Sequence, residues 1–332
     1  MAIIDKPSDY FNTKLYVGNG GTQSITGLDF QPDWVWIKNR SSAQNNRLFD
    51  SVRGAGFNLV SNATSAQIAA GTGTDGQLRS FTSDGFTVGS DGSVNNNNEN
   101  IVSWNWKESA DAGFDILTYE GSGSAQTISH NLGVKPDMII VKNIDSSDPP
   151  FNWRVYHSSL GAGVALKLNG TDAVSDDPGY WNDTEPTSSV FSVKNSGETN
   201  NSGQTYIAYL FAGKQGYSKF GSYTGNGNAD GTFVYTGFKP AFIMVKRSNG
   251  TENWTIMDNT RDPFNVAGNK LHPNTTGGTD AGATIDILSN GFKNRTTNAG
   301  ANGSGDSYIY MAIAENPFVT STDNGSIPAT AR

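Results

Sequence analysis

Short apolar runs separated by polar turns dominate the pattern of hydrophobic and polar positions along the chain. Residues 137–142 are apolar without a break over the length of a strand, which is typical of a strand buried on both faces. Residues 152–157 alternate large apolar and polar side chains, the period of two of a strand. Segments 205–211 and 307–313 are also expected to be strands, and the only helical candidate is a two-turn segment at 61–70.

Strand-like runs recur roughly every 8–15 residues, with Gly, Asn, Asp and Ser between them. This spacing predicts an all-β protein built as antiparallel β-sandwiches or jelly rolls. The pattern does not choose between these two topologies.

An internal repeat of about 104 residues organises the chain. In each copy a glycine-rich turn follows a tyrosine, and an apolar run then follows a proline and ends in a lysine. The tyrosine, proline and lysine recur as Tyr16, Pro32 and Lys38, as Tyr119, Pro136 and Lys142, and as Tyr223, Pro240 and Lys246. The repeat predicts three tandem β domains at 10–110, 111–218 and 219–317, with an N-terminal arm at 1–9 and a C-terminal tail at 318–332.

Two recurring charged motifs are interpreted as structural. The lysine that ends each apolar run is expected at the solvent edge of its strand, where it blocks further strand pairing. A triple anion site is the alternative for these lysines. The Asp-x-x-Arg motif at 50–53 and 258–261 predicts a local ion pair, and His157 takes the place of the aspartate in the middle copy.

Composition supports the all-β prediction, because 39 glycines and 35 asparagines among 332 residues disfavour helices and favour turns. The recurring glycines are expected to serve the shared scaffold, and the asparagines, including the run 95–98 and the pair 200–201, to mark variable surface. The net charge is −8 and no basic cluster stands out, so no nucleic-acid partner is expected. The absence of cysteine excludes disulfides and thiol nucleophiles.

The sequence contains no apolar stretch of membrane-helix length, and its first residues lack the features of a signal peptide. We therefore expect no membrane insertion and no ordinary secretion. A role outside the cell would then require lysis or delivery as part of a particle.

The residues that suggest chemistry are sparse. The three histidines show no metal-ligand spacing, and neither a metal nor another cofactor is expected. Five acidic residues gather in the middle copy, namely Asp172, Asp176, Asp177, Asp183 and Glu185. This cluster is open to three interpretations, which are a solvated loop, a contact surface for glycans or partners, and a catalytic carboxylate pair. The candidate recognition residues are Tyr180, Trp181, Asp177, Asp183 and Asn97.

The string Tyr-x-Gly-Asn-Gly, followed by Phe-x-Pro and an apolar run ending in Lys, is clearest at 16–38 and 223–246. It resembles a repeated β domain of unknown function found on tail-fibre and other virion structural proteins of marine, cyanophage-like bacteriophages. The resemblance covers roughly residues 10–317 and carries no catalytic residues.

The resemblance implies a non-enzymatic structural protein, made in the host cytoplasm and exposed on the virion surface. It would be an appendage, either a tail fibre or fibre tip, or a knob that decorates the capsid. The implied partners are other capsid or tail proteins and host-surface glycans, in an oligomeric assembly. A carbohydrate-binding array or surface adhesin is the alternative, and a glycan-degrading enzyme is a third. Three similar domains also suggest a mimic of threefold symmetry, which requires a closed rather than a linear arrangement.

Overall fold

Antiparallel β-strands form almost all of the regular structure in the computed structural model, which describes residues 4–69, 77–145 and 149–318. Strands hold 45% of the residues and helices 4%, which confirms the all-β prediction. The helices are single turns, η1 (Pro7–Asp9), α1 (Gly92–Asn95) and α2 (Gly197–Asn200). The helix expected at 61–70 is wrong, because residues 61–69 form a turn and the short strand β6; residue 70 lies outside the described part.

The strands fall into three groups, here called units 1, 2 and 3, and each group contains a larger and a second sheet. In unit 1 the sheets have the orders β1-β9-β3-β4-β5-β6 and β2-β8-β7. Its strands are β1 (Phe11–Val17), β2 (Gln23–Thr26), β3 (Trp34–Asn39), β4 (Arg47–Asp50), β5 (Phe57–Val60), β6 (Ile68–Ala69), β7 (Leu78–Thr82), β8 (Gly85–Val88) and β9 (Asn100–Trp106).

Unit 2 has the sheets β10-β17-β12-β13-β14-β15 and β11-β16, and unit 3 has β18-β25-β20-β21 and β19-β24-β23-β22. The strands of unit 2 are β10 (Phe114–Glu120), β11 (Gln126–Ser129), β12 (Met138–Asn143), β13 (Arg154–His157), β14 (Val164–Lys167), β15 (Ser175–Asp176), β16 (Val190–Val193) and β17 (Thr205–Phe211). Those of unit 3 are β18 (Ser218–Thr224), β19 (Phe233–Tyr235), β20 (Phe238–Arg247), β21 (Thr255–Asp258), β22 (Ala267–Lys270), β23 (Asp280–Leu288), β24 (Gly291–Asn294) and β25 (Ser307–Pro317). The domain boundaries expected from the sequence stay a prediction, and the units are defined by these strands.

The central strands of the first-named sheets are buried on both faces. Along β3, Val35 and Ile37 pack inside unit 1 against its second sheet, while Trp34 and Trp36 point to the opposite face. All six residues of β12 are buried in the same way, which confirms the doubly buried strand predicted at 137–142. A strand with two apolar faces needs a cover on each side, so each unit is a sandwich that also requires a neighbour.

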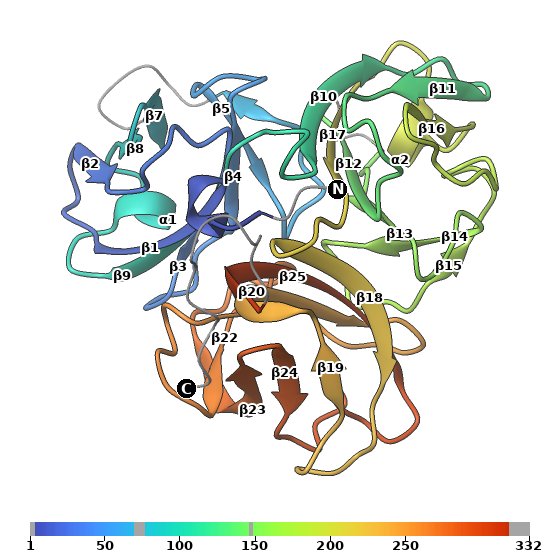
Figure 1. Cartoon of the computed structure of the whole chain (residues 1–332). Helices are drawn as coiled ribbons and strands as arrows, with labels where there is room; N and C mark the ends of the chain where they lie inside the picture. Colours follow the sequence, from blue (N-terminus) through green and yellow to red (C-terminus); the bar gives the residue numbers. More distant parts are fainter. Residues whose placement is uncertain (1–3, 70–76, 146–148, 319–332) are drawn as a thin grey trace.

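The three units supply that cover to one another. Figure 1 shows three lobes around a common centre, unit 1 in blue to teal, unit 2 in green to yellow, and unit 3 in gold to red. The outer faces of all three first-named sheets contribute to one aromatic-rich core at this centre. There Trp34 of unit 1 stacks on Tyr209 of unit 2 with 4.7 Å between ring centroids. Trp106 of unit 1 meets Phe242 of unit 3 edge to face at 5.5 Å.

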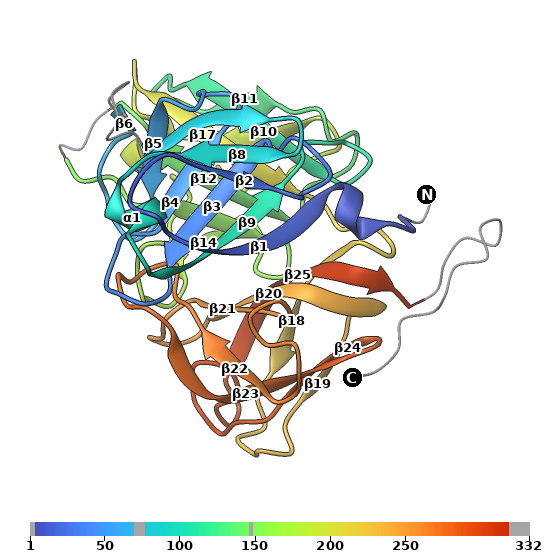
Figure 2. The ribbon, with the colours of Figure 1, turned by 90° about the vertical axis from the view of Figure 1, so that its left-hand side faces the viewer.

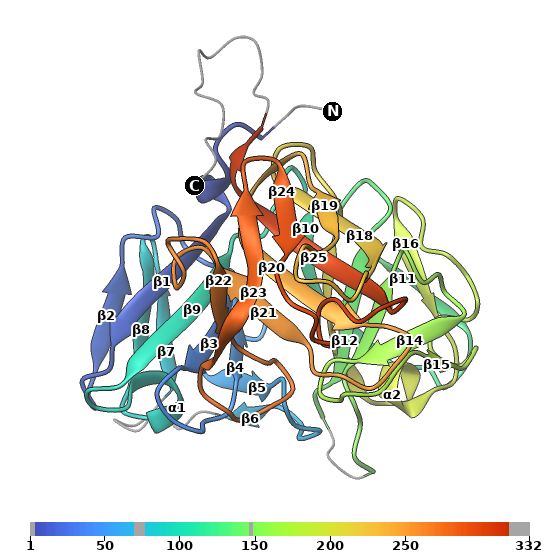
Figure 3. The ribbon, with the colours of Figure 1, turned by 90° about the horizontal axis from the view of Figure 1, so that it is seen from below.

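The two ends of the described chain lie at the same end of the molecule (Figures 2 and 3). The helix η1, which precedes unit 1, packs against β25, the last strand of unit 3. The backbone amide of Ile4 donates to the carbonyl of Gln215, between units 2 and 3, at 3.2 Å. These contacts join the beginning of the chain to its end and close the arrangement.

The recurring Gly-x-Gly turns rest on buried asparagines. A Cβ at Gly18 would lie 2.1 Å from the carbonyl oxygen of Asn96, so this turn requires glycine. Asn95 is fully buried beneath the turn, and its side-chain amide donates to the carbonyls of Gly21 (2.5 Å) and Gly89 (2.8 Å). Equivalent buried asparagines hold the turns of the other units, Asn200 in unit 2 and Asn302 in unit 3.

The glycines therefore serve the scaffold as expected. The expectation that asparagines mark variable surface is wrong for Asn95 and Asn200, because the side-chain amide of each donates to backbone carbonyls inside the fold.

Candidate functional site

The recurring lysines lie between units and not at a solvent edge. Lys38, Lys142 and Lys246 are each fully buried, which contradicts the expected exposed position. Each ammonium donates to a carbonyl oxygen of a neighbouring unit. The three bonds are Lys38 to Thr276 (2.7 Å), Lys142 to Thr64 (2.9 Å) and Lys246 to Thr171 (3.1 Å).

These bonds run in one rotational sense, from unit 1 to unit 3, from unit 3 to unit 2 and from unit 2 to unit 1. Burial lowers the pKa of all three lysines from the usual 10.5 to about 8. The anion-site alternative also fails, because the ammonium groups already donate to backbone carbonyls of the protein.

A second set of contacts uses the Asp-x-x-Arg motif. The predicted ion pair is confirmed, since an Arg53 nitrogen lies 2.6 Å from Asp50 and Arg261 lies 2.5 Å from Asp258, both fully buried. Each aspartate also accepts a bond from the neighbouring unit. The hydroxyl of Tyr209 donates to Asp50 at 2.7 Å, and the indole nitrogen of Trp104 donates to Asp258 at 2.9 Å.

In the third contact of this set, between units 2 and 3, both residues differ from those of the other two contacts. Met311 occupies in β25 the place that Trp104 has in β9 and Tyr209 has in β17, and its thioether has no hydrogen to donate. His157 ends β13, as Asp50 ends β4. Its Nε2 lies 3.2 Å from the carbonyl oxygen of Tyr310, the residue before Met311. Between units 2 and 3 the residue that would donate the hydrogen bond and the aspartate that would accept it are therefore both replaced.

The residue preceding β4, β13 and β21 makes a third set of contacts between units. Trp153 donates its indole hydrogen to the carbonyl of Val60 at 3.0 Å, and Trp254 donates to that of Lys167 at 2.8 Å. Asn46 donates to the carbonyl of Thr275 at 2.9 Å. The rotational sense is again the same, so the three sets together define a closed, pseudo-threefold ring.

The candidate recognition residues do not form a common surface. Tyr180 and Trp181 are buried, which contradicts their assignment to a recognition surface. The guanidinium of Arg154 lies 4.0 Å above the Tyr180 ring, and Trp181 packs edge to face on Tyr156 at 6.0 Å. Both aromatic residues therefore fill the core of unit 2.

The remaining candidates are at least partly accessible. Asp183 and Asn97 are exposed, in units 2 and 1 respectively, and Asp183 has a positive φ of 46°. Asp177 is half-buried, and its Oδ1 accepts from the amide of Gly179 at 2.8 Å, as in a turn.

The acidic cluster of the middle unit is spread over separate contacts. Glu185 accepts from Lys135 (2.7 Å), from the hydroxyl of Tyr156 (2.6 Å) and from the amide of Ala162 (2.8 Å). These bonds, opposed by partial burial, lower the pKa of this carboxyl. A hydrogen bond from Lys167 likewise lowers the pKa of Asp172. A general acid for glycoside cleavage requires the opposite shift.

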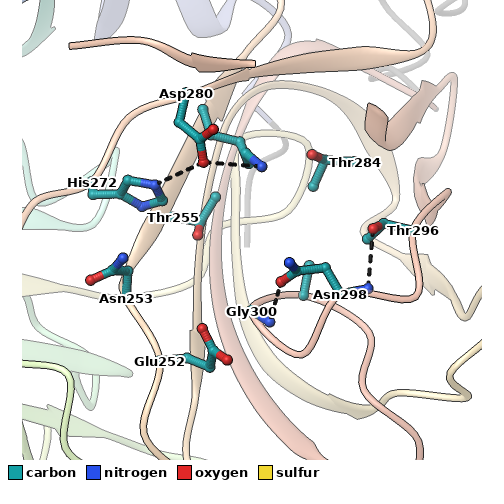
Figure 4. Close-up of a pocket in the computed structure, with 11 residues that line it drawn as sticks. Glu252, Asn253, Thr255, His272, Asp280, Thr284, Thr296, Asn298 and Gly300 are labelled. Carbon is teal, nitrogen blue, oxygen red and sulfur yellow. Dashed lines mark hydrogen bonds and ion pairs between the residues drawn. The ribbon is translucent and has the colours of Figure 1, made fainter. Parts of the chain in front are cut away.

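A polar pocket of about 140 Å³ opens in unit 3. Its walls come from the start of β21, from β22 and β23, and from the loop before β25 (Figure 4). Its lining residues are Glu252, Asn253, Thr255, Lys270, His272, Asp280, Thr284, Thr296, Asn298, Gly300 and Ala301. The sequence motifs did not point to this pocket.

Two charged contacts form one wall of the pocket. Asp280 lies 3.2 Å from the ammonium of Lys270 and 3.5 Å from Nε2 of His272. Nδ1 of His272 faces the carbonyl of Trp254 at 2.7 Å, which fixes the ring. In Figure 4, Glu252 and Asp280 lie at opposite ends of the hollow.

Within residues 4–69, 77–145 and 149–318, no three His, Asp or Glu side chains gather in a way that would hold a metal ion. No helix in these ranges has the length and apolar composition of a membrane span.

The fold and the ring define a class of all-β proteins in which three sandwich units share one core. A family model described as a domain of unknown function, DUF7483, matches residues 6–317. The chain belongs to this family, and the match runs through all three units. None of the curated proteins matches the chain.

Proposed function

We propose that this protein is a non-enzymatic structural component of a bacteriophage particle, exposed on the particle surface at a position of threefold symmetry. The closed ring of contacts between units is the observation that carries this proposal. The resemblance of the sequence to virion proteins supports assignment to a particle, and the closed ring supports a position of threefold symmetry.

Three similar units related by rotation present three similar outer faces, as a homotrimer does. Such a chain fits a tail-fibre tip or a knob on the capsid, where its neighbours are arranged in threes. Fusing the three units in one chain also allows one of them to differ, which a homotrimer cannot do. A string of independent sandwiches would leave the outer faces of their first-named sheets uncovered.

Antibody labelling of purified particles of the phage that encodes the chain tests this proposal. Gold label at the tail tip or over the head supports it, and the two patterns separate the fibre tip from the capsid knob. Particles that contain the other structural proteins but bind no antibody, although the antibody detects the free chain, would refute it.

The carbohydrate-binding array remains the second candidate, because the unit 3 pocket presents donors and acceptors of hydrogen bonds. The pocket occurs in one unit and the ring involves all three. The ring therefore favours the structural role for the chain as a whole, with binding as an added property of unit 3.

A further inference from the structure

The pocket in unit 3 exists because a side chain that fills the same space in units 1 and 2 is missing. The first residue of β4 is Arg47 and that of β13 is Arg154, but β21 begins with Thr255. Arg154 forms an ion pair with Glu198 and covers Tyr180, and a nitrogen of Arg47 lies 4.0 Å from Asp91. In units 1 and 2 a guanidinium therefore closes the space that is hollow in unit 3.

The partners of the arginines have changed as well. Relative to the buried asparagines Asn95, Asn200 and Asn302, Asp91 corresponds to Asn298, and Glu198 corresponds to Gly300. Unit 3 therefore has neither the arginine nor the acidic residues that contact this arginine in units 1 and 2.

The position two residues before the buried Trp254 also differs. In unit 1 it is Gln44, which accepts a bond from Ser93 at 3.4 Å, and in unit 2 it is the buried Phe151. In unit 3 it is Glu252, which lines the pocket. Nothing in the described part of the chain donates a hydrogen bond to its carboxylate.

The groups that remain suit a ligand rich in hydroxyls. The side-chain oxygens of Asn253 and Asn298 accept bonds from Asn274 at 2.7 Å and from Gly300 at 2.7 Å, and among the described residues neither NH₂ donates a hydrogen bond. The carboxylate of Glu252 offers hydrogen-bond acceptors, and a threonine hydroxyl can either donate or accept a hydrogen bond. A sugar hydroxyl both donates and accepts, so it satisfies such a mixed set. The two carboxylates outnumber the single lysine, which disfavours phosphate and other anions.

We propose that the unit 3 pocket binds one neutral sugar residue of a glycan. Its volume of about 140 Å³ suits a single pyranose ring and not an extended chain. The proposal rests on the proposed function only for the origin of the glycan, a host surface, and the pocket itself is independent of any particle.

Saturation-transfer NMR on the full chain tests the proposal. The probes are methyl α-glucoside, methyl β-galactoside, methyl α-mannoside and N-acetylglucosamine, with ethylguanidinium and inorganic phosphate as charged competitors. At least one sugar should receive saturation from the wild type. The variant Thr255→Arg restores the side chain found in units 1 and 2 and should weaken that binding about tenfold or more.

Two further variants distinguish a loss of sugar binding from a loss of folding. Glu252→Gln changes one acceptor without changing shape and should weaken binding severalfold. The control Thr26→Arg makes the same substitution at an exposed threonine of β2 and should bind as the wild type does.

The proposal is overturned if no sugar in the panel binds, if ethylguanidinium or phosphate binds in place of the sugars, or if binding survives Thr255→Arg and Glu252→Gln together. Sugar binding by particles that lack this chain would not affect the result, since the assay uses the isolated protein. Antibody labelling of particles fails or succeeds independently of it.

Discussion

The three buried lysines should make the protein more stable as the pH rises from about 8 to 9.5. Their pKa is about 8 in the folded protein and 10.5 in an exposed chain. Because folding lowers the pKa of these lysines, their contribution to the stability of the fold is complete above pH 10.5. This contribution is lost as the pH falls through about 8. At pH 9 each folded lysine has released ~0.9 of its proton while the unfolded chain keeps nearly all of it, so each contributes ~1.2 kcal/mol of stability per pH unit.

Urea unfolding at pH 7.5, 8.5 and 9.5 measures this slope, with the midpoint compared at a constant m-value. The wild type should gain up to ~3.6 kcal/mol per pH unit near pH 9 from the three lysines together. Buried tyrosines act in the opposite direction at higher pH, since burial raises the pKa of Tyr310 to about 12. The experiment therefore stops below pH 10.

The slope of a single variant separates the lysines from every other group. Lys142→Met should reduce the pH dependence by about a third of the lysine contribution, whatever its effect on stability at pH 7. Lys107→Met, at an exposed lysine of the linker between units 1 and 2, should retain the wild-type slope. If Lys142→Met and the wild type give parallel curves between pH 8 and 9.5, the lysine does not change its charge on folding and the reasoning is wrong.

Further predictions concern single contacts of the ring and the turns. Tyr209→Phe removes the donor to buried Asp50 and should cost about 2 kcal/mol in urea unfolding, whereas Tyr235→Phe at an exposed site should cost less than about 0.5; equal losses would contradict the ring. Asn302→Ala removes four hydrogen bonds to backbone and side-chain groups and should cost about 3 kcal/mol, against a near-neutral change at exposed Asn97; a loss below about 1 kcal/mol would contradict the turn argument. Burial and then contact with Asp115 raise the pKa of Glu108 to about 7, so its stabilising contribution is present below pH 4.5 and is lost as pH rises through 7. Glu108→Gln should flatten that decline, and an unchanged pH profile from 4.5 to 7.5 would refute it.

The fold class and the doubly buried strands follow from local patterns in the sequence. The run ending at Lys142 is apolar at both odd and even positions, and only a strand covered on both faces makes that arrangement stable. The pattern is silent about what supplies the second cover. In this protein it is the neighbouring unit 1, whose Trp34 stacks on Tyr209 of unit 2 in a core that no single unit contains.

The predicted solvent-edge position of the lysines is wrong because an apolar run ending in lysine is compatible with two environments. At a solvent edge the ammonium is hydrated, and between units it needs carbonyl oxygens at the right distance. The carbonyl that receives Lys38 belongs to Thr276, which is 238 positions away, so no local pattern reveals it. Recurrence in all three copies was the available signal, since three identical charges at one structural position imply a shared contact.

The predicted exposure of the aromatic residues in the middle unit is wrong for a related reason. Tyr180 and Trp181 lie in a loop rich in Asp, Pro and Gly, a composition typical of exposed turns. The loop packs inward because β11 and β16 form a sheet of two strands, where unit 1 has three and unit 3 has four. The two rings supply apolar area that the missing strands would have contributed.

Comparing equivalent positions across the units separates scaffold from binding more sharply than composition does. Where all three units make the same contact, as at the lysines, the shared ring requires it. Where both partners change together, as at Met311 and His157, the ring is preserved by compensation. At Thr255 the arginine and its acidic partners are lost without replacement, and the space stays open and polar. The sugar site that we propose lies at this position, where unit 3 departs from the contacts shared by units 1 and 2.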